Sequence, residues 1–360
     1  MQKKISYKSS GVDISAANAT KKKMAASLDT KNPLVLNKFG AFASLLDGRF
    51  QGYRHPVLVC KTEEPGSKQL LAFKYNRIEG ICQDLINHLI NDVIVMGAKP
   101  LFIQDLIVCG KLEKDTVSAL VKHIAETCKK QGAVLTGGET SEQPNVLAKG
   151  TYVLGASCIG VVEKDEIIDG SAIRPGDIVL AAASSGLHTN GYTLVRALMK
   201  NDPKIIKTKI ASRNFIDEIL TPHRCYYTAL QYLFPKKIIK GMAHITGGGI
   251  PENMNRILPA GLKAAIDSSA IRILPIFKFI REKTGNSDRD MIRTFNLGVG
   301  LTVVVNPKDS AAVISHLKKG RIDCYEIGRI ESGGKQNVEM VGQLLWSRSR
   351  GIVPRRHNQS

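Results

Sequence analysis

The chain has 360 residues, 43% of them hydrophobic, and carries 51 Lys and Arg against 32 Asp and Glu, a formal net charge of +19. This length exceeds one typical hydrophobic core and predicts two domains. No apolar run approaches the roughly 18 residues of a membrane helix, and no apolar stretch follows the first lysines, so we expect neither a membrane segment nor a secretory signal.

Seven scattered cysteines without a C-x-x-C pair argue against a zinc or redox motif and predict a cytoplasmic protein. The positive charge favours anionic ligands. The lysines are spread along the chain without the interleaved aromatics of an RNA-binding sheet, so nucleic acid is not the expected partner. The basic tail, residues 346–360, is predicted to be disordered.

Residues 1–32 are polar and predict an arm with a short helix. The elements expected next are a strand at 56–60, a loop at 62–68, a helix at 77–96, a strand at 101–109, a helix at 116–130, a strand at 133–136, a glycine turn at 137–140 and a strand at 151–162. The turn-rich stretch 171–177 marks the predicted boundary between a first domain at 1–170 and a second at 171–345.

The second half begins with a predicted strand at 177–183 and a helix at 192–199. Further helical or strand-like runs lie at 225–233, 251–258, 262–266, 296–305, 311–318 and 324–330. Mixed helices and strands in both halves predict an α/β or α+β fold.

Two glycine-rich motifs in the second half each open onto a helical run. They are Gly186-Leu187-His188-Thr189-Asn190-Gly191-Tyr192 and Ala243-His244-Ile245-Thr246-Gly247-Gly248-Gly249. Backbone N–H groups at a glycine-rich turn before a helix bind anions readily. Two such turns indicate phosphate chemistry.

Carboxylates are the notable feature of the first half. Asp84, His88 and Asp92 are spaced four apart, which places them on one face of the helix 77–96. Asp105 interrupts an apolar strand, where an unpaired carboxylate is costly, and Glu139 follows a double glycine. Because Mg²⁺ prefers a few carboxylates together with phosphates, these acids suggest a metal site, although a solvated helix face would explain the helical pair alone.

Taken together, these segments resemble the phosphoribosylformylglycinamidine cyclo-ligase family, also called aminoimidazole ribonucleotide synthetases, from residue 7 to about residue 330. The matching stretches are Gly11-Val12-Asp13, Asn91-Asp92, Gly97-Ala98-Lys99-Pro100-Leu101-Phe102, Gly110-Lys111-Leu112, Gly137-Gly138-Glu139-Thr140, Val161-Val162-Glu163-Lys164, Ile167-Ile168-Asp169-Gly170-Ser171, Ser184-Ser185 with the first glycine motif, the second glycine motif, and Arg293-Thr294-Phe295-Asn296-Leu297-Gly298-Val299-Gly300.

The resemblance implies a homodimeric enzyme of purine biosynthesis whose substrate is a small ribonucleotide. Its N-terminal sheets would pair across the dimer into a β-barrel, and its C-terminal domain would be an α/β sandwich. ATP and Mg²⁺ would drive closure of the imidazole ring of formylglycinamidine ribonucleotide through an iminophosphate. Such phosphoryl transfer needs positioning and charge stabilisation rather than an enzyme nucleophile.

The resemblance also implies roles for single residues. Mg²⁺ would be held by Asp92, Asp105 and Glu139. ATP would be surrounded by Glu63, Lys68, Asp84, Asn91, Lys111, Gly137 and Gly138. The substrate would be bound by Gly186, His188, Asn190, Gly191, His244, Thr246, Gly247, Gly248 and Gly249. The expected catalytic residues are His188, Asp92 and Lys68, with His188 donating to an oxyanion or relaying a proton; a structural role stays open for His244.

The chain departs from the family pattern at three places in its first half. Where the family has Thr-Asp-Gly-Val-Gly-Thr-Lys, this chain has Thr62-Glu63-Glu64-Pro65-Gly66-Ser67-Lys68, which loses a glycine and an N–H donor. The segment 37–42 has fewer glycines, and Gln143-Pro144-Asn145 replaces Met-Pro-Gly. His88 and Asn87 stand where the family has small or apolar residues and receive no role. Two alternatives therefore remain: another ATP-dependent phosphotransferase of the superfamily, and a non-catalytic binding or scaffold paralogue.

Overall fold

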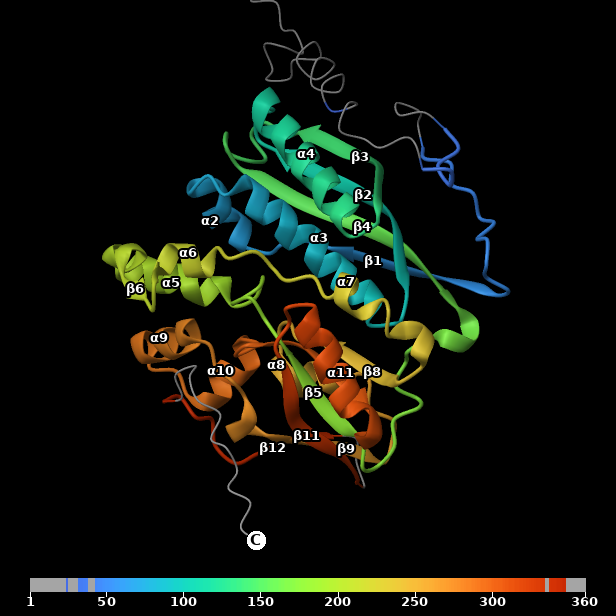
Figure 1. Ribbon diagram of the computed structural model, residues 1–360. Coiled ribbons are helices and arrows are strands. Elements are labelled where there is room, and N and C mark those ends of the chain that lie inside the picture. Colours follow the sequence, from blue (N-terminus) through green and yellow to red (C-terminus); the bar gives the residue numbers. More distant parts are fainter. Residues whose placement is uncertain (1–23, 25–31, 38–42, 334–336, 348–360) are drawn as a thin grey trace, which may run out of the picture.

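The computed structural model describes residues 24, 32–37, 43–333 and 337–347, and it divides into two halves, each built on one sheet (Figure 1). The arm and helix predicted near the N-terminus, the basic tail beyond residue 347 and most of the segment 37–42 lie outside the described residues. Within the described residues, no helix is both long and apolar enough to cross a membrane.

The first half is a four-stranded sheet in the order β1-β4-β2-β3. Its strands are β1 (Pro56–Glu63), β2 (Lys99–Cys109), β3 (Val134–Glu142) and β4 (Tyr152–Glu163). Two 17-residue helices, α3 (Ile78–Ile94) and α4 (Lys114–Lys130), pack on one face of this sheet, and the short α2 (Lys68–Lys74) precedes them. The apolar residues of α3 recur at helical spacing, so one side of the helix enters the core.

The second half is a six-stranded sheet in the order β12-β9-β11-β5-β10-β8. Its strands are β5 (Ile178–Ala183), β8 (Ile239–His244), β9 (Leu262–Asp267), β10 (Val299–Val305), β11 (Cys324–Ser332) and β12 (Asn337–Val341). Its helices are α5 (Tyr192–Asn201), α6 (Phe215–Ile219), α7 (Tyr227–Leu230), α8 (Gly249–Asn255), α9 (Pro275–Thr284), α10 (Asp288–Thr294) and α11 (Pro307–Lys319); β6 (Lys209–Ile210) and β7 (Arg213–Asn214) form a small ribbon.

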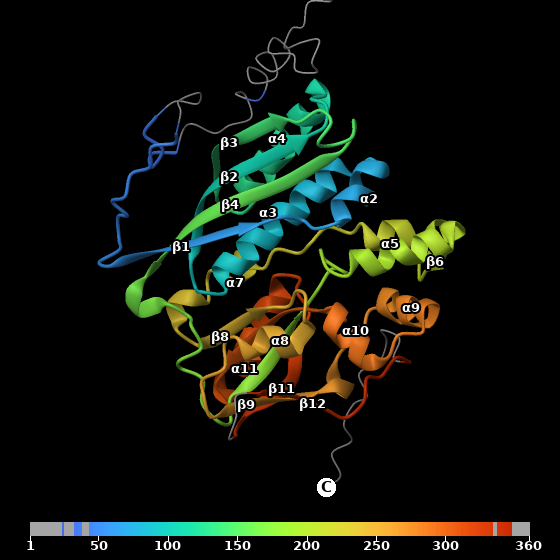
Figure 2. The same cartoon turned by 180° about the vertical axis from the view of Figure 1, so that it is seen from behind.

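Both faces of the central strand β5 are covered, which explains its unbroken apolar sequence. Leu180 and Ala182 belong to the apolar cluster that includes α11, whereas Val179 and Ala181 belong to the cluster that includes α8. Figures 1 and 2 show these two helices on opposite sides of the sheet. The α11-side cluster also contains residues of α3, α4 and α7, so the two halves share one core.

The structure confirms the α/β character of both halves and corrects several expected elements. The glycine turn predicted at 137–140 is wrong, because β3 continues through it in parallel register with β2. Helices α2, α9 and α10 were not expected. Helix α2 begins at Lys68, at the end of the loop with altered sequence, and α10 begins with a Ser287–Asp290 capping box that was overlooked.

Candidate functional site

The polar face of α3 meets the second half of the chain at the centre of the molecule. Asp84 and Asn91 are each at most 1% exposed, so their polar atoms need protein partners. Asp84 Oδ1 accepts from the backbone N–H of His223 at 2.7 Å, and Asn91 Oδ1 accepts from that of Tyr226 at 3.0 Å. Asp84 and Asn91 therefore hold the segment that follows α6.

Lys68 lies beside this face of α3, and its contacts differ from those expected of a lysine that binds ATP. Its Nζ donates to Asp84 Oδ1 at 2.8 Å, to the carbonyl oxygen of His188 at 3.0 Å and to that of Thr221 at 2.8 Å. The Lys68 side chain is 1% exposed, and burial lowers its pKa despite the pull of Asp84. With all three ammonium hydrogens used, this arrangement does not support the expected role of Lys68 in binding phosphate; it ties the two halves together.

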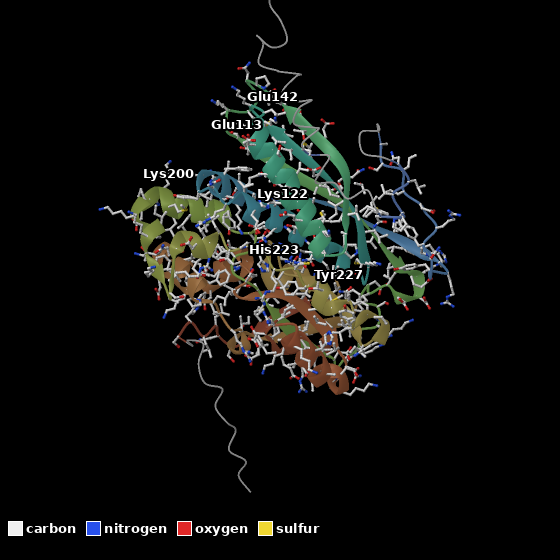
Figure 3. All side chains as sticks on the ribbon, turned by 45° about the horizontal axis from the view of Figure 1, so that its top comes forward. Glu113, Lys122, Glu142, Lys200, His223 and Tyr227 are labelled. Atoms are coloured by element: carbon white, nitrogen blue, oxygen red, sulfur yellow. The ribbon has the colours of Figure 1, made fainter. Side chains whose placement is uncertain are left out.

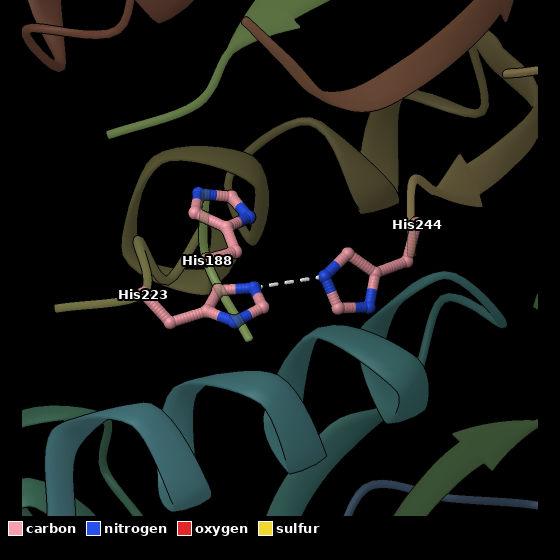
Figure 4. A group of neighbouring side chains, drawn as sticks. All are labelled: His188, His223 and His244. Atoms are coloured by element: carbon pink, nitrogen blue, oxygen red, sulfur yellow. Dashed lines mark hydrogen bonds between the residues drawn. The ribbon is translucent and has the colours of Figure 1, made fainter. Parts of the chain in front are cut away.

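A chain of hydrogen bonds runs from α3 into the second glycine motif. His244 Nδ1 bonds Asp92 Oδ1 at 2.7 Å, and His244 Nε2 lies 2.9 Å from His223 Nε2 (Figure 4). Since the carboxylate accepts from Nδ1, the Nε2 of a neutral His244 is an acceptor and the Nε2 of His223 donates. Burial acts to raise the pKa of Asp92, but the hydrogen bond and charge of His244, with His88 and Lys61, hold it below its usual range.

Four histidines gather here, and we call His88, His188, His223 and His244 the histidine cluster. The rings of His188 and His223 stack with centroids 3.8 Å apart. Burial lowers the pKa of His88 to about 4 and those of His188 and His223 well below their ordinary value. These three imidazoles are therefore neutral at physiological pH.

The two glycine motifs lie side by side in the structure. A Cβ added to Gly247 would lie 3.6 Å from Asn190 Oδ1. Gly191 caps α5 with a left-handed φ of 79°, and its Cβ would overlap the ring of Phe295. The Nδ2 of Asn190 and the Nδ1 of His188 are buried without a hydrogen-bond partner among the described residues. Unpaired buried donors are costly, so a ligand with acceptor groups fits this place.

The second motif has fewer free backbone donors than its sequence suggests. The N–H of Gly248 donates to the carbonyl of Arg293 and that of Gly249 to the carbonyl of Thr246, both at 3.0 Å. Thr246 Oγ1 itself donates to Asn253 Oδ1 at 3.3 Å. A cavity of about 460 Å³ opens beside Gly248, with Arg289 and Arg293 in its wall. The same wall carries the carboxylates of Glu252 and Asp288, and Arg293 already lies 3.4 Å from Glu252.

Glu63 reaches the edge of the histidine cluster through Lys61. Lys61 Nζ bonds Glu63 Oε1 at 2.7 Å and lies 3.1 Å from Asp92 Oδ2. These two carboxylates raise the pKa of Lys61 against the effect of burial. The ammonium group of Lys61 thus contacts Asp92, on which the family resemblance placed Mg²⁺, and Glu63 forms an ion pair with Lys61.

Gly186 shapes the first glycine motif. Its φ is 155°, and its carbonyl oxygen accepts hydrogen bonds from the side chains of Ser184 and Asn296.

The three carboxylates expected to bind Mg²⁺ do not form one ligand set. Asp105 pairs with Gly138, and Leu106 pairs with Glu139, along the parallel strands β2 and β3. Successive side chains of a strand point to opposite faces, so Asp105 lies on the buried face and Glu139 on the exposed one. Among the described residues, no group of three metal-binding atoms within 4.8 Å of one another joins these acids with Asp92.

The remaining residues of the expected ATP site also lie away from the histidine cluster. Asp105 is 9% exposed, its Oδ2 has no partner in the described part of the chain, and burial raises its pKa to about 7. A Cβ on Gly138 would meet Asp105 Oδ1 at 2.0 Å, which explains that glycine, and Gly137 adopts a φ of 153° in the same strand. Lys111 is exposed in the turn after β2.

Sequence reasoning missed His223 and Lys61 and gave His88 no role. His88 had a usable signal, since it shares its helix face with Asp84 and Asp92. His223 sits in an irregular segment between α6 and α7, and only the fold brings it to the centre of the molecule, where Figure 3 shows it between the two halves. Nothing in the sequence distinguished Lys61 from the other lysines of the chain.

Two family models match the chain. The model of the AIR synthase related protein, N-terminal domain, matches residues 54–162, and that of the AIR synthase related protein, C-terminal domain, matches residues 174–341. The phosphoribosylformylglycinamidine cyclo-ligase of Burkholderia multivorans is 39% identical over 338 residues, which is 94% of this chain and 96% of the relative. The enzyme of the same name from Methylobacillus flagellatus is 40% identical and is covered over 97% of its length.

Solved structures share the fold at low identity. E. coli HypE matches with a TM-score of 0.65 and 18% identity, covering 91% of this chain and 94% of HypE. The thiamine-monophosphate kinase of Stenotrophomonas maltophilia matches with a TM-score of 0.60 and 15% identity, covering 93% of this chain and 98% of the kinase. The likeness extends over both halves, and with the near full-length identity to the named enzymes it places the chain in the phosphoribosylformylglycinamidine cyclo-ligase family.

Proposed function

We propose that this protein closes the imidazole ring of formylglycinamidine ribonucleotide at the expense of ATP, releasing 5-aminoimidazole ribonucleotide, ADP and phosphate. The observation that carries the proposal is the identity of 39–40% to cyclo-ligases over 94% of the chain. The reaction is a step of purine biosynthesis, and the chain is an ATP-dependent ligase. All seven cysteines are free thiols, which suits a reaction in the reducing cytoplasm.

The substrate site of this proposal lies between the two glycine motifs. His188 Nδ1 and Asn190 Nδ2, the two buried donors without partners, would bind acceptor groups of the substrate. The substrate 5′-phosphate would enter the cavity beside Gly248, where Arg289 offers charge-assisted hydrogen bonds and Arg293 would do so on exchanging its contact with Glu252 for the phosphate. The buried position of His188 keeps water away from the groups it contacts.

ATP supplies the phosphoryl group that turns the substrate amide oxygen into a leaving group. Among the solved structures of this fold is hydrogenase maturation protein HypE in complex with ATP, which is 17% identical and has a TM-score of 0.64. Mg²⁺ belongs to the proposal as the ion that the ATP phosphates carry. Asp92, Asp105 and Glu139 do not fit as a common ligand set for this ion.

A homodimer is also part of the proposal. The face of the first sheet opposite α3 and α4 is incompletely covered: Leu58 and Leu106 are 54% and 43% exposed. Leu34, Val35, Leu46, Phe50 and Tyr53 pack against only part of this face, around Phe102 and Val161. An apolar face of this kind is suited to pairing with the same face of a second copy.

The decisive assay combines the purified chain with formylglycinamidine ribonucleotide, ATP and Mg²⁺ and measures ADP and aminoimidazole ribonucleotide. Equal amounts of both products are expected. ADP without the imidazole would indicate a related phosphotransferase, and neither product would indicate a binding or scaffold protein. Asn190→Ala tests the substrate site in the same assay, with Asn201→Ala as a control at an exposed asparagine at the end of α5 away from the first glycine motif.

A further inference from the structure

Three imidazoles from separate segments converge at the centre of the molecule. His188 follows β5, His223 precedes α7, and His244 ends β8. They are 0%, 1% and 5% exposed, and one nitrogen from each lies within 4.8 Å of the others (Figure 4). Burying three imidazoles together costs free energy unless each nitrogen finds a partner. His188 Nδ1 has none among the described residues.

The contact between His223 and His244 has nearly the geometry of a metal site. Their Nε2 atoms are 2.9 Å apart and share one proton. Two imidazole nitrogens bound at about 2.0–2.1 Å to a tetrahedral ion lie about 3.4 Å apart. Moving the rings apart by about half an ångström and shifting that proton from Nε2 to Nδ1 of His223, which faces Thr189 Oγ1, would let both Nε2 atoms bind one cation.

Outer partners already orient these rings as metal ligands are oriented. Asp92 accepts from His244 Nδ1 at 2.7 Å, which turns the lone pair of Nε2 toward His223. Thr189 Oγ1 lies 3.5 Å from His223 Nδ1 and 3.0 Å from His88 Nδ1. A carboxylate or hydroxyl on the far nitrogen fixes the tautomer of a metal-binding histidine.

We propose that His188, His223 and His244 bind a divalent transition metal of the nitrogen-preferring class, with Zn²⁺ as the reference ion. Imidazole ligands suit Zn²⁺, Co²⁺ or Ni²⁺, whereas Mg²⁺ requires oxygen ligands. The Nε2 of His188 accepts from the N–H of Ser185 at 3.2 Å, so Nε2 carries the lone pair, and it would bind the ion once the ring turns out of its stack with His223 and away from Ser185.

A second group, His88 with Asp92 and His244, is less suited to a metal. Lys61 Nζ already lies 3.1 Å from Asp92 Oδ2, so a metal there would meet an ammonium ion at short range. At the proposed site Asp92 serves instead as the outer partner of His244. The proposed site offers nitrogen ligands, which Mg²⁺ does not favour, and it does not depend on the proposed cyclisation.

The test is Co²⁺ titration of the untagged, full-length chain after EDTA treatment, without nucleotide or substrate. Visible Co²⁺ absorption typical of a four- or five-coordinate nitrogen site should saturate at one ion per chain, and Zn²⁺ but not excess Mg²⁺ should displace it. His223→Asn should abolish this saturable signal, and Asp92→Asn should weaken binding about 10- to 100-fold. His123→Asn, on α4 beside Glu126, is the control and should bind normally.

Wild-type protein that gives no saturable Co²⁺ absorption would overturn the proposal, whatever the variants do. Equal binding by the His223 and His123 variants would also overturn it, because the ion would then lie elsewhere. Far-ultraviolet circular dichroism confirms that each variant is folded before titration. If the wild-type protein binds Co²⁺ as expected but shows no cyclo-ligase activity, the proposed function is contradicted and the proposed metal site is not.

Discussion

Replacing Asp105 with Asn should make the stability of the protein less dependent on pH. The Asp105 side chain is 9% exposed and faces the core between the first sheet and its helices, with Oδ2 unpaired among the described residues. Burial raises its pKa from 3.8 to about 7. The folded protein therefore keeps a proton on Asp105 at pH values where the unfolded chain has lost it.

The sign of the effect follows from this difference in proton binding. Stability contributed by a group whose folded pKa is raised is present at low pH and falls as the pH rises from its unfolded to its folded pKa. Here that window runs from 3.8 to about 7. At about 1.4 kcal/mol for each pH unit, the whole window is worth about 4 kcal/mol, and the part between pH 5 and 8 about 3 kcal/mol.

Urea unfolding of wild type and Asp105→Asn at pH 5 and pH 8 measures this contribution. The wild type should lose about 3 kcal/mol more than the variant between the two pH values. Asp165→Asn, at a carboxylate whose side chain is 56% exposed, should differ from wild type by at most about 1 kcal/mol at either pH. Equal losses of unfolding free energy in wild type and Asp105→Asn would refute the reasoning. The pKa of Asp105 would then be the same in the folded and the unfolded protein.

Three further substitutions test other contacts. Lys68→Met leaves a buried carboxylate without its cation and should cost about 3–5 kcal/mol of unfolding free energy, against at most about 1 kcal/mol for the exposed Lys122→Met; similar losses in both would contradict the buried pair. Asn190→Ala should lower kcat/KM by about tenfold or more, the loss of one hydrogen bond worth about 1.5 kcal/mol, and an unchanged value would remove Asn190 from the substrate site. Gly249→Ala, whose Cβ would meet a carbonyl oxygen of α10 at 1.8 Å, should lower the melting temperature far more than Gly132→Ala, where φ is similarly positive but the space is open.

Much of the fold could be predicted from local pattern. The apolar spacing along α3 and the unbroken apolar run of β5 each reflect how many faces of the element are buried, and that is visible in the sequence. The prediction of a glycine turn at 137–140 was wrong because the local sequence does not show what packs against these glycines. Glycine does signal turns, but here Gly138 is required because the Asp105 carboxylate fills the space where a side chain would lie.

The candidate site could be predicted only in part. Its glycine motifs carry local signals, and the structure does bring Asn190 next to Gly247. The partners of Asp92 and Lys68 come from distant segments: His244 lies 152 residues from the former, and the carbonyl of Thr221 lies 153 residues from the latter. No periodicity records such pairings, so a lysine placed near phosphate by resemblance proved to be a buried link.

The position of α3 explains why the glycine motifs depend on the first half of the chain. One face of this helix binds the segment after α6 through the N–H of His223 and the carbonyl of Arg224, and binds the end of β8 through His244. Each of these contacts is directional and wholly or partly buried, so it fixes the loops more narrowly than apolar packing would. A change that shifts α3, such as a ligand drawing on Asp92, must therefore move His244 as well. This helix face links the two halves together with Lys68 and the apolar core that both halves share.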